Sequence, residues 1–367
     1  MFGWQWLTVH SNYQGHWNAL FCTGAELHQP PELAGEHIYL FPDSKGYDGQ
    51  MYHYIAHDPF FIRGFDSYVD APRMRYRRIL VPLAAHLLAF GRDDRVDPAY
   101  TAVILLAVFG GGYWLSMYCS MLGFSAAWGL AFVLIPATLI SMDRLTVDVA
   151  LLAACVAFVV FLMRGARWGM YAVLVTAPLI RETGFLLVAA YVVWLASERK
   201  FRQASLFLTA ATPALGWYLF ILLNTEPESF QGLSLIPLQG IAESIATPYK
   251  YQFAAWINAA STVLDYFALA GIAIAIALAL HMAWRREWGG SQAAIYLFAL
   301  LAMFLYSPGA WTEVYAFGRT LSPLVLFLAL FGLWKRNWIY ALPLCLAIPR
   351  TAIQLTPQVS GVLQHFI

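Results

Sequence analysis

The chain has 367 residues, of which 60% are hydrophobic and 12% are charged, and its mean hydropathy is +0.60. Soluble globular chains carry about 25% charged residues, so this composition excludes an ordinary water-soluble protein and indicates an integral membrane protein. The 22 Lys and Arg against 21 Asp and Glu give a formal net charge of +1. A charge so close to zero argues against nucleic acid as a partner.

The charged residues divide the chain into two regions. Residues 1–98 contain 11 of the 21 acidic residues, 8 of the 22 basic residues and 7 of the 9 histidines. Residues 99–367 are mostly apolar runs. We therefore expect an extracytoplasmic polar region with short helices over 1–98, and a transmembrane helical bundle over 99–367.

The apolar runs predict an all-α, polytopic bundle of about ten membrane helices. Crossing the hydrocarbon core of about 30 Å takes about 20 apolar residues. Spans are predicted near 99–120, 124–140, 146–163, 203–224, 259–284, 291–307, 320–334 and 337–350. The apolar stretch 168–196 is interrupted by Arg181-Glu182-Thr183-Gly184, which predicts two short helices meeting at a polar turn.

The basic residues of the short turns predict the orientation. Four short turns together carry nine Lys and Arg: 164–167, 199–202, 285–286 and 335–336. In a ten-helix bundle all four turns fall on one side, which the positive-inside rule assigns to the cytoplasm. Residues 1–98 and the turn at 181–184 then lie outside. Because no membrane helix can be read ahead of residue 98, either residues 79–90 enter the membrane or an upstream helix is absent from this chain.

The segment Gly46-Tyr47-Asp48-Gly49-Gln50 reads as a turn that enters a short helix. Asp48 stands where an N-cap belongs, and one interpretation is that its carboxylate accepts the first free backbone N–H groups. The other is that Asp48 is a base whose pKa is raised by partial desolvation near the membrane surface. The first interpretation requires that the helix stabilises the Asp48 anion, whereas the second requires that its surroundings destabilise that anion.

His53 and His57 are spaced i, i+4 on the same predicted helix, and Asp58 follows them. Two metal ligands can use this spacing, so a divalent metal is a weak candidate. No third ligand at a fixed spacing completes a metal motif, and the alternative is an aromatic and imidazole surface against the membrane interface. We expect no cofactor.

Four arginines lie within six residues just before an apolar segment: Arg73, Arg75, Arg77 and Arg78. The planar guanidinium group binds phosphate through paired hydrogen bonds, so a lipid phosphate is a natural ligand. The alternative is simple snorkelling of basic side chains at the lipid headgroups.

Three further charged residues fall in or beside apolar segments. Arg181 and Glu182 interrupt one, where ionisable residues are costly and usually face a partner, a cavity or a functional site. A structural ion pair is the alternative. Arg319 opens a late apolar segment on the predicted outer side, either as another phosphate contact or as a plain charge at a helix end.

The segments GYDGQMYHYIAHDPF (46–60), DAPRMRYRRILVPL (70–83), RETGFLL (181–187) and GRTLSPL (318–324) together resemble bacterial multi-pass proteins related to the GT-C glycosyltransferases. The resemblance implies a mannosyltransferase-like enzyme of the bacterial inner membrane that uses a polyprenyl-phosphate sugar as donor. It implies an inverting transfer to a saccharide or other hydroxyl acceptor, with Asp48 as base. The residues that would then bind the substrate or its phosphate are Tyr47, Gln50, Arg73, Arg75, Arg77, Arg78, Arg181, Glu182 and Arg319.

Two other classes of function fit the same residues. Outward arginines and an intramembrane Arg181-Glu182 pair would also suit a transporter or flippase of lipid-linked saccharides. Transporters more often have two matching broken helices, and only one is predicted here. A non-catalytic scaffold of envelope assembly is the third interpretation. The sequence lacks the Walker A, Rossmann, H-E-x-x-H and G-x-S-x-G patterns, which leaves ATPase, dehydrogenase, zincin and serine hydrolase functions unsupported.

Overall fold

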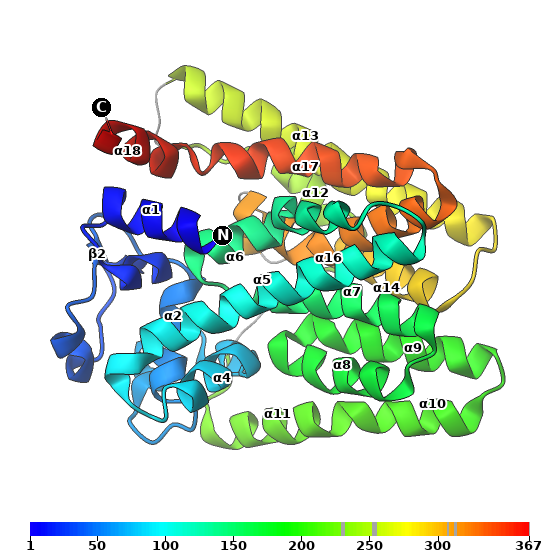
Figure 1. Cartoon of the computed structure of the whole chain (residues 1–367), viewed down its shortest axis with the longest axis horizontal. Helices are drawn as coiled ribbons and strands as arrows, with labels where there is room; N and C mark the ends of the chain where they lie inside the picture. The colour runs from blue at the N-terminus through cyan, green and yellow to red at the C-terminus, as the bar shows by residue number, and fades with distance from the viewer. Residues whose placement is uncertain (229–231, 252–254, 307, 312–313, 367) are drawn as a thin grey trace.

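A computed structural model gives the fold of residues 1–228, 232–251, 255–306, 308–311 and 314–366. The described residues are mostly helical, as the apolar runs predict, and they include one short pair of strands. Long helices run roughly side by side, and the N-terminal region gathers at one end of them, drawn in blue in Figure 1.

The N-terminal region is built from short elements joined by turns. Strands β1 (Thr23–Gly24) and β2 (Leu40–Phe41) pair in parallel, with Thr23 opposite Leu40. The helical elements are α1 (Phe2–Asn12), η1 (Trp17–Phe21), η2 (Pro31–Glu36), α2 (Asp48–His57), η3 (Phe65–Tyr68), α3 (Pro72–Arg75), α4 (Leu80–Leu88) and η4 (Asp93–Arg95).

The rest of the described chain forms the bundle. Its first half consists of α5 (Val96–Met121), η5 (Ala126–Leu134), α6 (Pro136–Arg144), α7 (Asp148–Arg164), α8 (Arg167–Ile180), η6 (Glu182–Gly184), α9 (Phe185–Ser197), α10 (Phe201–Leu208), η7 (Thr209–Ala211) and α11 (Thr212–Asn224). Its second half consists of α12 (Gln239–Ala246), α13 (Ala255–Trp284), α14 (Gly290–Phe304), α15 (Pro308–Trp311), α16 (Val314–Lys335), η8 (Trp338–Ala341), α17 (Leu342–Ile353) and α18 (Thr356–Phe366).

Every apolar run predicted from the sequence contains a helix, but fewer helices than predicted are long enough to cross a membrane. Four helices in the described ranges are long and apolar enough: 93–121, 201–224, 255–284 and 315–335. Two bent pairs bring the number to six if each pair is one span. The segment predicted as one span over 124–140 is such a pair, since η5 and α6 meet at an angle of 62° where Pro136 begins α6.

The polar turn inside 168–196 lies where the sequence predicts it. Helix α8 ends at Ile180, Arg181 is extended, and η6 leads into α9. Gly184 lies so close to α8 that an added Cβ would be 2.2 Å from the carbonyl oxygen of Ala177. This tight turn brings Arg181 and Glu182 to the end of the bundle instead of its middle.

The basic turns gather at the opposite end of the bundle. Arg336 donates a hydrogen bond to the carbonyl oxygen of Leu122 at the end of α5, and Lys335 pairs with Glu287 at 2.9 Å. Trp288 in turn donates a hydrogen bond to the hydroxyl of Ser197, the last residue of α9. Turns far apart in sequence therefore share one end, and the N-terminal region and the 181–184 turn share the other (Figure 1).

Helix α4 is where residues 79–90 were expected to enter the membrane. It packs against α5 and against α2. Its nine residues rise about 14 Å, which is less than half of a hydrocarbon core of about 30 Å. It is therefore too short to be a membrane span on its own.

Candidate functional site

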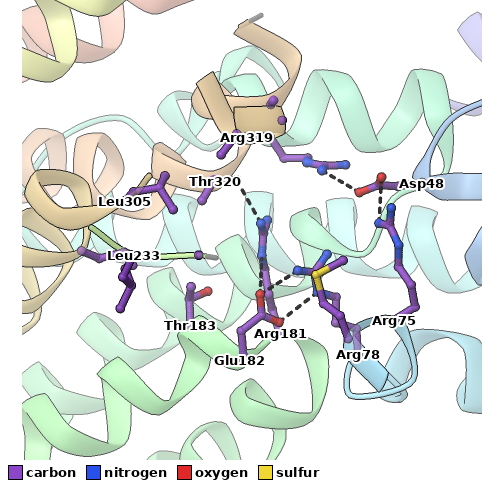
Figure 2. A pocket seen from close by; sticks show the side chains of 16 residues that line it. Asp48, Arg75, Arg78, Arg181, Glu182, Thr183, Leu233, Leu305, Arg319 and Thr320 are labelled. Carbon is purple, nitrogen blue, oxygen red and sulfur yellow. Dashed lines mark hydrogen bonds and ion pairs between the residues drawn. The ribbon is translucent and has the colours of Figure 1, made fainter. Parts of the chain in front are cut away.

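A cavity of about 440 Å³ lies where the N-terminal region meets the ends of α8, α14 and α16. One wall is charged and consists of Asp48, Arg75, Arg78, Arg181, Glu182 and Arg319. The facing wall is apolar or small and includes Leu233, Leu301, Leu305, Ala310 and Ala316. Figure 2 shows the charged side chains converging from separate segments, with Leu233 and Leu305 on the other side.

Asp48 lies at the centre of the charged wall. Its Oδ1 is 2.7 Å from Nη1 of Arg75, and its Oδ2 is 2.6 Å from Nη2 of Arg319. Burial by itself would raise the pKa of Asp48, but the positive charges of Arg319 and Arg75 outweigh burial and hold the pKa well below its usual range.

Both sequence interpretations of Asp48 need correction on these contacts. The N-cap of α2 is Tyr47, no side chain caps the helix, and Asp48 is the first helical residue. The expected rise in the pKa of Asp48 is also wrong, because two guanidinium groups stabilise the anion. Only the folded chain brings Asp48 close to both arginines, so this proximity cannot be predicted from the local sequence.

Arg75, the last residue of α3, and Arg78, in the segment that follows α3, both reach the cavity. Arg75 also binds Asp70 through two hydrogen bonds of 2.9 and 2.8 Å. Arg78 binds Glu182 through two hydrogen bonds of 2.9 and 2.6 Å and donates to the hydroxyl of Tyr52 at 2.8 Å. Paired hydrogen bonds of this kind fix a guanidinium plane, so both arginines are held in orientation.

Arg181 and Arg319 are joined through Asp148, the first residue of α7. Arg181 is hydrogen-bonded to Asp148 and donates to the hydroxyl of Thr320 at 2.9 Å. Nε of Arg319 is 3.4 Å from Oδ2 of Asp148. The expected Arg181-Glu182 ion pair is therefore only a long contact of 3.9 Å, and each of the two residues has a closer partner of its own.

The charged wall has more positive than negative charge. Four arginines and two carboxylates line the cavity, which leaves an excess of two positive charges in the lining itself. Asp70 and Asp148, which pair with Arg75 and Arg181 from outside the lining, balance this excess. Nη1 of Arg319 is buried and has no hydrogen-bond partner in the part of the chain that the structure describes. Buried donors normally have partners, so this wall can accept an anion.

Four residues predicted for the site do not line the cavity. Arg73 donates to the carbonyl oxygen of Thr225, and Arg77 lies over the ring of Tyr218, 5.3 Å from its centroid. Gln50 is buried between the backbone N–H of Gly24 and the hydroxyl of Tyr54. Tyr47 lies under the guanidinium group of Arg319, at 5.3 Å, and so touches the site from behind.

His53 and His57 lie together on α2, away from the lining of this cavity. Their exposed fractions are 0% and 3%, so the interpretation as a surface against the membrane interface is wrong. Asp58 is separate from them: its carboxylate accepts hydrogen bonds from the backbone N–H groups of Ile62, Arg63 and Phe65. Asp58 thus stabilises the turn that follows α2 and is not a metal ligand beside the histidines.

The sequence interpretation missed Asp148, Thr320 and Tyr52 as partners of the arginines. The only signal for Asp148 was an acidic residue at the start of an apolar run. Comparison of the chain with family models, curated proteins and solved structures found no match.

Proposed function

We propose that the protein is a membrane glycosyltransferase that moves a sugar from a polyprenyl-phosphate donor to a hydroxyl acceptor. The observation that carries this proposal is a cavity with an arginine-rich wall opposite an apolar wall. A lipid phosphate has the same two characters, an anionic headgroup joined to a long apolar chain. The volume of about 440 Å³ falls in the range of 300–1,000 Å³ typical of ligand sites.

The proposal places the cavity at the outer surface of the membrane. The basic turns share one end of the bundle, which the positive-inside rule would assign to the cytoplasm, and the cavity lies at the opposite end. We retain ten membrane helices as part of this proposal, with the short α9 and α14 spanning together with their neighbours. The N-terminal region would then form the extracytoplasmic cover of the cavity, in the membrane of a bacterial cell.

Asp48 is the proposed base, and this role requires that its ion pairs with Arg75 and Arg319 weaken before it accepts a proton. A carboxylate paired with two arginines is a weak proton acceptor. A bound phosphate would compete for Arg75 and Arg319. As their charge is drawn to the phosphate, burial becomes the dominant influence on Asp48 and its pKa rises toward a useful value. Donor binding would thus activate the base.

The reaction follows from these positions. Asp48 takes the proton of the acceptor hydroxyl while the acceptor oxygen forms a bond to the anomeric carbon. The bond from that carbon to the phosphate oxygen breaks, and its electron pair leaves with the lipid phosphate, where arginines stabilise the charge. One base and a good leaving group suffice for inversion, with no carboxylate nucleophile.

The test uses purified protein in lipid nanodiscs and a polyprenyl-phosphate sugar labelled in the sugar. We expect release of free polyprenyl phosphate and transfer of label to an added saccharide, both lost in Asp48→Asn. The matched control is Asp70→Asn, which removes a carboxylate that pairs with Arg75 but does not line the cavity. Full transfer by Asp48→Asn would exclude Asp48 as the base.

Transport of a lipid-linked saccharide is a second candidate, favoured by one observation. The ion pairs of Asp48 with Arg75 and Arg319 suit a group that holds arginines in place for binding as well as they suit a latent base. In liposomes, movement of the labelled headgroup across the membrane without cleavage of the donor would support transport and contradict the transferase proposal.

A further inference from the structure

A second group of polar side chains lies beside the first, within the N-terminal region. It consists of Glu36 at the end of η2, His53 and His57 on α2, and Asp97 in the first turn of α5. One ligand atom from each lies within 4.8 Å of the others. Three segments that are separate in sequence therefore present two imidazoles and two carboxylates to one point.

The distances are close to those between ligands of a single ion. The two Nε2 atoms of His53 and His57 are 3.1 Å apart, and oxygens of Glu36 lie 3.4 Å from His57 and 3.6 Å from His53. Four ligands at bond lengths of about 2.0–2.1 Å in a tetrahedron lie about 3.3 Å apart. Asp97, at 2.7 Å from His53, would shift outward from it, and the most widely separated ligand atoms, up to 4.8 Å apart, would draw together around the ion.

The hydrogen-bond arrangement orients His57 for coordination. Its Nδ1 is 2.8 Å from Oδ1 of Asp93, and the same oxygen accepts a hydrogen bond from Arg63. A carboxylate at Nδ1 holds the proton on that nitrogen, so the lone pair of Nε2 points to the cluster. Metal-binding histidines commonly have such a partner on their other nitrogen.

The cluster also lacks donors to match its acceptors. Both carboxylate oxygens of Glu36 are buried and accept no hydrogen bond within the described residues, with the nearest imidazole nitrogens 3.4 and 3.6 Å away. Buried acceptors without donors are uncommon and call for a specific explanation such as an ion. Asn18 donates to the carbonyl oxygen of Glu36 and so fixes the backbone that carries this acid.

From these observations we infer that Glu36, His53, His57 and Asp97 bind one divalent transition-metal ion, with Zn²⁺ as the best fit. Two imidazoles and two carboxylates in a buried, four-ligand arrangement match the donor set and coordination number that zinc favours. The inference does not depend on the proposed sugar transfer.

The position of the site defines its role. Asp48 and His53 share α2 and are five residues apart, about 7.5 Å along the helix axis. The ion would join η2, α2 and the start of α5 and so fix the helix that carries Asp48. We therefore assign it a structural role, with no part in bond cleavage.

The first experiment measures metal content and stability of the full-length protein, purified through a tag without histidine. We expect about one zinc ion per chain by mass spectrometry of the metal. Treatment with EDTA should lower the melting temperature, and added Zn²⁺ should restore it. Absence of bound metal, together with no rise in melting temperature on adding Zn²⁺, Mn²⁺, Fe²⁺ or Co²⁺, would overturn the inference.

The second experiment locates the ion. We expect Glu36→Gln and His57→Gln each to lose at least nine-tenths of the metal. Glu32→Gln and His28→Gln, exposed residues of the same region, should keep it. Metal content unchanged in both cluster variants would place the ion elsewhere and overturn the assignment. If these variants do not fold, Co²⁺-loaded wild type decides: visible bands of a four-coordinate ion support the site, and a six-coordinate spectrum contradicts it.

Discussion

Replacement of Asp48 by Asn should separate binding from catalysis, because Asp48 competes with any anion for Arg75 and Arg319. Both ion pairs are short, at 2.7 and 2.6 Å, so a phosphate bound by the same guanidinium groups would lie about 6 Å from the carboxylate. At that distance and an effective dielectric constant of about 20, the repulsion is about 3 kcal/mol per unit charge. Solvent in the cavity reduces this to about 1–2 kcal/mol.

We therefore expect Asp48→Asn to bind polyprenyl phosphate about 5- to 30-fold more tightly than the wild type. Transfer should fall by about 10²–10⁴-fold because the base is lost. The assay is equilibrium binding of labelled polyprenyl phosphate in nanodiscs, run beside the transfer assay. Asp70→Asn should change the affinity less, because the Asp70 side chain is 44% exposed and contacts Arg75 but not Arg319. Weaker binding by a folded Asp48→Asn variant would refute the idea of competition.

Three further substitutions test the site and the fold. Arg319→Gln should weaken binding of polyprenyl phosphate about 10- to 100-fold, since it removes a charged donor worth about 1.5–3 kcal/mol. Arg77→Gln, outside the cavity, is the matched control. Equal losses of affinity in both variants would argue against the site. Asp148→Asn should lower the free energy of unfolding by about 3 kcal/mol, because two buried guanidinium groups lose a shared partner; an unchanged melting temperature in detergent would contradict this. Gly184→Ala should destabilise the fold, because its Cβ would collide with the backbone of α8, whereas Gly35→Ala, with nothing within 4 Å, should melt like the wild type.

The sequence predicts the helices of the bundle well, because apolar runs of helical length depend on local composition. It also predicts the polar turn at 181–184, since charged residues interrupt an apolar run there. It does not predict the bend of 62° at Pro136, which depends on packing between helices. The number of about ten spans stays a prediction, because four to six helices in the described ranges are long and apolar enough to cross a membrane.

Of the candidate site, the sequence identifies the arginine residues but not their partners. Arg75, Arg78, Arg181 and Arg319 line the cavity, whereas Arg73 and Arg77, from the same basic run, point to α11 and its end. Which way each arginine extends from α3 and from the turn after it is decided by tertiary contacts. The partners are separated by up to 271 residues, as for Asp48 and Arg319, and no local pattern can join them.

The histidine cluster shows the same limit. The i, i+4 spacing of His53 and His57 is visible in the sequence, and it correctly suggests that the two imidazoles share a helix face. Glu36 and Asp97 come from other segments, and the neighbouring Asp58 points to a backbone turn instead. Proximity in sequence therefore selected the wrong carboxylate.

The most direct measurement is the structure of the protein in nanodiscs loaded with polyprenyl phosphate, determined by electron cryomicroscopy. We predict density for the phosphate within hydrogen-bond distance of Arg319 and of Arg75 or Arg78, with the lipid chain along Leu233 and Leu305. A phosphate bound elsewhere, with Asp48 still paired to both arginines, would contradict the proposal that this cavity binds a lipid phosphate.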